Sequence, residues 1–139
     1  MLGDPNKLDY PKAEDKAAAS PVNFKIIIPS TRSGSIHIKE STFQKRVDEV
    51  ADYVTKLFEG STISKGFGTY TSDDKKTVGE NVAVISVFTK QDVYNRHDID
   101  LLQYLKSRRR AWTQWSMGFE YQGVFYLIKA REKKKAGEL

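Results

Sequence analysis

The chain lacks cysteine and has few histidines, and both shortages limit the nucleophiles and metal ligands that it can supply. Among 139 residues there is no Cys, and the two His are His37 and His97. Disulfides, thiolate nucleophiles and cysteine metal sites are therefore excluded. Carboxylates would have to supply most ligands of a metal, and no spacing of acidic residues indicates such a site. We expect neither a metal nor another cofactor.

Long apolar runs are missing as well. No stretch approaches the ~18 apolar residues of a membrane span, so we expect no membrane partner. The N-terminal residues lack the basic and apolar regions of a secretory signal, which favours a cytoplasmic protein. A length near 140 residues fits one domain, and a hydrophobic content of 39% is too high for a disordered chain.

Positive charge is in excess but unevenly placed. The formal net charge is +5, made up of −1 over residues 1–22, +3 over 23–128 and +3 over 129–139. All four prolines lie within the first 29 residues. We therefore predict a flexible N-terminal arm over 1–22, a single domain over 23–128 and a basic C-terminal tail over 129–139.

Hydrophobic periodicity predicts the elements of the domain. Apolar residues recur at helical spacing in two segments, 42–58 and about 92–114. Continuous or alternating apolar runs predict strands in five segments: 24–28, 61–71, 81–88, 115–121 and 124–128.

The first helix has recognisable end signals. Ser41 and Gln44 have the spacing of a capping box, in which the serine oxygen accepts a hydrogen bond from a free backbone amide. Gly60 suits the left-handed residue that ends many helices. On the polar face, Lys45 and Glu49 are four residues apart and are expected to pair.

The element order, β-α-β-β-α-β-β, is that of a split βαβ fold. We predict an α+β ferredoxin-like sandwich with an antiparallel sheet, two helices on one face and a C-terminal hairpin. The apolar strands 24–28 and 81–88 suit central positions, whereas strand 61–71 is polar and contains glycines, which suits an edge.

Two of the strands are apolar on both faces. Strands 81–88 and 124–128 carry large apolar residues at successive positions, yet two helices cover one face of the sheet only. We predict a homodimer or a larger homo-oligomer that forms through the open sheet face. The alternative is that residues 1–22 or 30–40 cover this face within one chain.

Basic residues supply the candidate binding site. Arg32 lies in a polar loop rich in hydroxyls, which suits an anion, and a cluster at the end of the second helix adjoins Trp112 and Trp115. The alternative is that the arginines of this cluster pack their stems on the core and complement the helix dipole. The candidate anion-binding residues are Arg32, Lys65, Lys106, Arg108 and Arg110.

The segment Lys65 to Gly68 reads Lys-Gly-Phe-Gly. It resembles the first half of the octamer of the RNA-recognition motif, a family with the same βαββαβ order, and the resemblance implies sheet aromatics that stack on bases. The residues that follow, Thr69 to Ser72, depart from the octamer. The structural alternative is an edge strand with a bulge or a close backbone contact at the glycines.

No pattern indicates catalysis. The sequence has no serine elbow, paired-carboxylate pattern or metal signature, and we predict no catalytic residue. Our leading hypothesis is a small, oligomeric, non-enzymatic binding protein whose partner is nucleic acid or another anion. One alternative is a structural or protein-interaction accessory module, such as a viral or plasmid-encoded protein. The other is a small enzyme of the dimeric α+β barrel type, with a pocket between sheet and helices.

Overall fold

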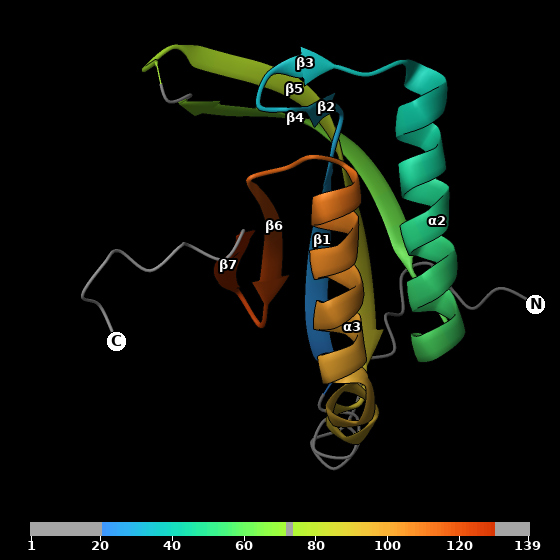
Figure 1. The fold of residues 1–139 in the computed structure, drawn as a ribbon. Coiled ribbons are helices and arrows are strands. Elements are labelled where there is room, and N and C mark those ends of the chain that lie inside the picture. The colour runs from blue at the N-terminus through green and yellow to red at the C-terminus, as the bar shows by residue number, and fades with distance from the viewer. Residues whose placement is uncertain (1–20, 72–73, 130–139) are drawn as a thin grey trace, which may run out of the picture.

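The fold is built on an antiparallel sheet with two helices against one of its faces (Figure 1). The computed structural model describes residues 21–71 and 74–129. In chain order the elements are β1 (Val22–Pro29), β2 (Thr31–Arg32), β3 (Ile36–His37), α2 (Glu40–Phe58), β4 (Thr62–Thr71), β5 (Thr77–Thr89), α3 (Gln91–Ala111), β6 (Ser116–Tyr121) and β7 (Val124–Lys129).

The sheet has the strand order β4-β5-β1-β6-β7, and every neighbouring pair is antiparallel. This order confirms the predicted ferredoxin-like split βαβ fold with an added C-terminal hairpin. The apolar strands β1 and β5 lie inside the sheet and the polar β4 lies at its edge, as their composition predicts. The short strands β2 and β3 pair with each other in a separate two-stranded sheet.

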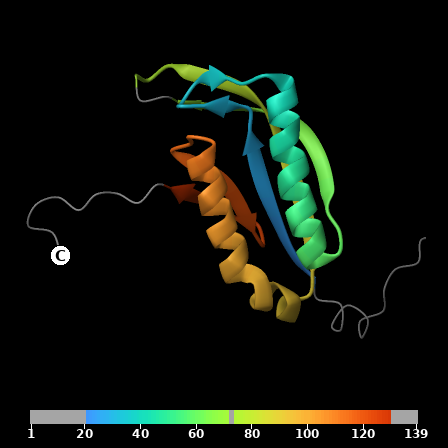
Figure 2. The ribbon, with the colours of Figure 1, turned by 45° about the vertical axis from the view of Figure 1, so that its right-hand side comes forward.

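The core lies between the sheet and the helices (Figure 2). Alternate residues of β1 face the helices, and Phe24, Ile26 and Ile28 are completely buried there. Val50 of α2 and Leu105 of α3 are equally buried opposite them. Burial of one such side chain contributes roughly 1.5–3 kcal/mol, so this single layer fixes both helices on the same face.

The ends of α2 differ from the expected signals. The residue before the helix is Lys39, which makes no side-chain cap, and Ser41 lies within the first turn. The predicted capping box is therefore wrong. At the other end Glu59 takes the left-handed conformation, with φ of 71°, and donates its N–H to the carbonyl of Thr55 at 2.8 Å. The left-handed residue that ends α2 is therefore Glu59, one position before the predicted Gly60.

The predicted domain limits fall partly outside the described residues. Residues 1–20 of the arm and 130–139 of the tail lie there. Val22, which we had assigned to the arm, is buried and opens β1, and Lys129 closes β7. Within the described part of the chain, no helix has the length and apolar content needed to cross a membrane.

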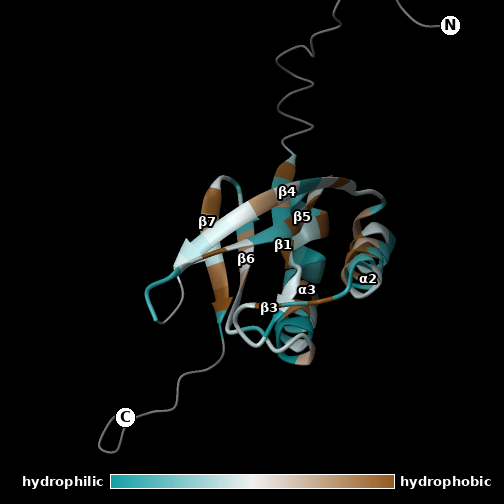
Figure 3. Cartoon of the chain, turned by 90° about the horizontal axis from the view of Figure 1, so that it is seen from above, coloured by the Kyte–Doolittle hydropathy of each residue, from teal (hydrophilic) through white to brown (hydrophobic). Residues whose placement is uncertain are grey.

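Among the described residues, both helices lie against one face of the sheet and none lies against the second face (Figure 3). Phe88 on β5 is 67% exposed, and Phe125 on β7 is 55% exposed. The sheet is thus apolar on its open side as well, as the sequence predicts. Residues at one end of this face form the concave surface described next.

Candidate functional site

A pocket of about 890 Å³ opens on the face of the sheet opposite α2 and α3. This volume lies in the range of small-molecule sites, roughly 300–1,000 Å³. Its apolar floor consists of side chains and backbone from four strands: Ile27, Val82, Gly118, Phe125 and Leu127. The sequence alternative of a pocket between sheet and helices is therefore wrong in its placement, because the apolar core fills that space.

Two loops and the β4–β5 hairpin form the rim of the pocket. Ser33 donates its backbone N–H to the carbonyl of Thr113 at 2.9 Å, and both residues have positive φ, 47° and 52°. Tyr70 on β4 donates its hydroxyl to the carbonyl of Gly34. Burial raises the pKa of Tyr70 above its usual value. The hairpin and both loops are thus joined into one wall.

Glu80 is the buried carboxylate of the pocket. It lies on β5, lines the pocket and is only 9% exposed. Its Oε2 is buried and accepts no hydrogen bond from the described residues. The strand partner of Glu80 is Gly68, which has no side chain to cover it. No group of three or more His, Cys, Asp and Glu side chains that could hold a metal ion occurs among the described residues.

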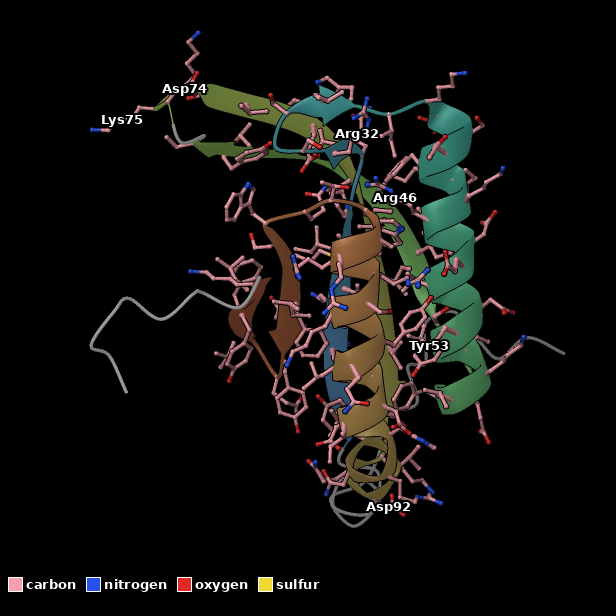
Figure 4. The ribbon with its side chains drawn as sticks, in the orientation of Figure 1. Arg32, Arg46, Tyr53, Asp74, Lys75 and Asp92 are labelled. Carbon is pink, nitrogen blue, oxygen red and sulfur yellow. The ribbon has the colours of Figure 1, made fainter. Side chains whose placement is uncertain are left out.

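Arg46 on α2 is a buried cation (Figure 4), and the charge of Glu80 is near enough to act on it. Its Nη1 donates hydrogen bonds of 2.8 Å to the carbonyls of Pro29 and Thr31, where the chain leaves β1. Burial lowers the pKa of Arg46 and the charge of Glu80 opposes that effect. The two side chains are close enough to influence each other, yet they form no ion pair within 4 Å. Arg46 does not line the pocket.

The predicted anion-binding residues lie elsewhere. None of the five lines the pocket, and they are distributed over β2, β4 and α3. Lys65 on β4 reaches the Glu40 carboxylate at 3.8 Å, and Arg108 on α3 contacts the Glu49 carboxylate at 2.5 Å. Arg32, Lys106 and Arg110 are exposed to solvent. Arg108 therefore joins the two helices, which is the structural alternative for that residue.

Glu80 was not predicted from the sequence, although a signal was present. We expected the strand to begin at residue 81, but β5 begins at Thr77. Val78, Glu80 and Val82 are alternate residues, and all three line the pocket. A lone carboxylate in an apolar alternating row is unusual, because burying a charge is costly. A predicted strand that began before residue 80 would therefore have identified Glu80 as a candidate site residue.

The sequence matches no family model and no curated protein. Two solved structures resemble this fold. One is a phage SAM lyase in complex with S-methyl-5′-thioadenosine, with a TM-score of 0.59 and 15% identity over 82% of this chain and 93% of that chain. The other is a phage SAM lyase in the apo state, with a TM-score of 0.53 and 15% identity over 81% of this chain and 92% of that chain.

At 15% identity these likenesses establish the fold alone. They also correct our leading hypothesis of a non-enzymatic binding protein, because both of these structures are of an enzyme. The small-enzyme alternative is the better supported one. Binding of nucleic acid or another anionic partner is not tested by these likenesses and stays a prediction from the sequence.

Proposed function

We propose that this chain is a small enzyme that binds S-adenosylmethionine in the open-face pocket and cleaves it, releasing S-methyl-5′-thioadenosine. The observation that carries the proposal is a pocket of small-molecule size, with a buried carboxylate, in a chain that shares its fold with a SAM lyase over most of both lengths. Fold alone does not fix function, so the pocket and its chemistry are the basis of the argument.

The composition of the pocket suits a nucleoside. Tyr70, Trp115 and Phe125 contribute aromatic surface around the rim and floor. Aromatic rings stack favourably on a planar base without reading a particular hydrogen-bond pattern. The carbonyls and hydroxyls of the loop at Ser33 to Ser35 provide polar groups for a ribose.

The reaction requires positioning more than acid–base chemistry. When a C–S bond of a sulfonium breaks, the electron pair stays on sulfur and the positive charge disappears. A lyase adds no water, so the carbon that loses sulfur forms its new bond within the same molecule. Its own carboxylate oxygen closes a ring, so that the new C–O bond forms as the C–S bond breaks and no proton has to move. The pocket would hold the flexible amino-acid chain in the reactive geometry and limit the access of water.

The test is product formation. Purified protein is incubated with S-adenosylmethionine, and S-methyl-5′-thioadenosine is quantified by chromatography against a sample without protein. We expect the product to form at a rate proportional to protein concentration. Product at the rate of spontaneous breakdown only would refute the proposal.

Self-association is a further part of the proposal. Outside the pocket lining the open face carries the exposed Phe88, and β7 is paired on one side only. An apolar edge strand beside an apolar face tends to pair with another chain. A second copy of this chain is the occupant we propose, and a cytoplasmic location remains our prediction from the sequence.

A further inference from the structure

The pocket is acidic in a basic protein. Its lining includes Asp74, Lys76 and Glu80, whereas the whole chain has a net charge of +5. Lys76 and Asp74 lie 3.9 Å apart and offset each other. Glu80 therefore gives the pocket a local charge of −1, opposite in sign to the molecule.

Glu80 has the charge of Arg46 nearby but forms no direct bond through its buried Oε2 with the described residues. It is nine-tenths buried, its Oε2 accepts no hydrogen bond, and it has no ion pair within 4 Å among the described residues. The nearby Arg46 already donates its Nη1 to the carbonyls of Pro29 and Thr31. A buried carboxylate left in this state attracts a cation strongly, because little water remains to screen it.

The walls of the pocket favour a cation as well. Tyr70 and Trp115 line the same pocket as Glu80. Aromatic faces attract cationic groups through their quadrupole, and the attraction grows as the site loses water. A carboxylate and aromatic rings around one cavity thus both favour a positively charged ligand.

We propose that Glu80 makes this pocket selective for charge: it attracts the sulfonium of the substrate and binds the neutral thioether product less tightly. This inference rests on the proposed function and assigns a specificity-determining residue to it. Because cleavage removes the positive charge from sulfur, the attraction ends with the reaction. The same carboxylate therefore favours entry of the substrate and release of S-methyl-5′-thioadenosine.

The test compares two ligands that differ in this charge. Sinefungin carries an ammonium group in place of the sulfonium and cannot be cleaved there, whereas S-adenosylhomocysteine has a neutral thioether. Calorimetry gives the Kd of both for the wild type, Glu80→Gln and Glu120→Gln. Glu120 is the matched control, because it lies on β6 outside the pocket lining, 3.6 Å from Lys25.

We expect the wild type and Glu120→Gln to prefer sinefungin by about tenfold or more, the effect of one attractive charge contact. In Glu80→Gln this preference should fall to less than about threefold, with binding of S-adenosylhomocysteine retained as the sign of an intact fold. Equal affinities of the wild type for the two ligands would overturn the inference, as would an unchanged preference in Glu80→Gln. Either result would leave the proposed function standing, because that proposal fails only if no S-methyl-5′-thioadenosine forms.

Discussion

The guanidinium of Arg46 lies over the indole ring of Trp112, 5.0 Å from the ring centroid. This contact joins α2 to the end of α3, and the same guanidinium binds the carbonyls that follow β1. One buried side chain thus fixes the three segments that meet beside the pocket.

We expect Arg46→Leu to lower the free energy of unfolding by about 3 kcal/mol, because two carbonyls lose their donor and Glu80 loses its neighbouring charge. Urea unfolding followed by circular dichroism measures the change. The control is Arg110→Leu, the same substitution at an exposed arginine. It should change the free energy of unfolding by no more than about 0.5 kcal/mol. Equal effects of the two substitutions would show that Arg46 has no such role.

Gly118 leaves room for the floor of the pocket. A Cβ at this position would lie 2.9 Å from Cε2 of Phe125 and 3.0 Å from Cδ1 of Ile27, so a side chain must shift. Because Phe125 is half-exposed, its ring is the group that moves, and it lines the pocket. We expect Gly118→Ala to raise the Kd for S-methyl-5′-thioadenosine about tenfold, because the displaced ring takes up space in the pocket.

The matched control for this substitution is Gly66→Ala on β4. A Cβ there meets only Cγ2 of Val82, at an ordinary 3.8 Å, and Gly66 does not line the pocket. Calorimetry on both variants gives the comparison. If the two variants bound the nucleoside equally well, the ligand would not occupy the floor at Gly118.

Tyr94 should make stability fall at alkaline pH. Burial raises its pKa to about 12, from an ordinary value of 10.0, with further contributions from nearby groups. Between these two values the unfolded chain loses the phenolic proton and the folded chain keeps it. The unfolded state therefore binds fewer protons, and the free energy of unfolding falls as pH rises from 10 to 12.

The experiment compares urea midpoints of the wild type and Tyr94→Phe across this pH range. The phenylalanine variant lacks the titrating group, so its curve should fall less steeply. Other titrating residues affect both proteins alike, and parallel curves would contradict the assignment.

Self-association should depend on the open face of the sheet. We expect light scattering to give a mass above the 15.8 kDa of one chain, and Phe88→Asp to shift it toward the monomer. Ile99→Asp is the control, because Ile99 is 68% exposed on α3, a comparable apolar position away from the sheet. A wild-type mass of one chain at every concentration would refute the oligomer.

Patterns along the chain predicted the fold better than they predicted contacts. The apolar runs placed β1 and β5 inside the sheet and the polar β4 at its edge, because burial depends directly on residue type. Ion pairing between side chains depends instead on residues that are far apart in the sequence and close in the fold. Glu49, expected to pair with Lys45, contacts Arg108 instead, which lies 59 residues away.

The pocket could not be predicted from the sequence, because it too depends on contacts between residues far apart in the chain. Its rim joins Ser33 to Thr113 and Tyr70 to Gly34, contacts between segments that no local pattern relates. The basic residues were predicted as the binding site because their charge can be read directly from the sequence. Glu80 became visible as a site residue only when its burial and its missing partners were known.

The rate of S-methyl-5′-thioadenosine release at low S-adenosylmethionine concentration tests the central claim most directly, because it measures kcat/KM for the pocket and its carboxylate together. The wild type and Glu120→Gln should release the product at rates within about twofold of each other, and Glu80→Gln about tenfold more slowly, through weaker attraction of the charged substrate. Release by Glu80→Gln at the wild-type rate would contradict the account, and so would a wild type that releases no product.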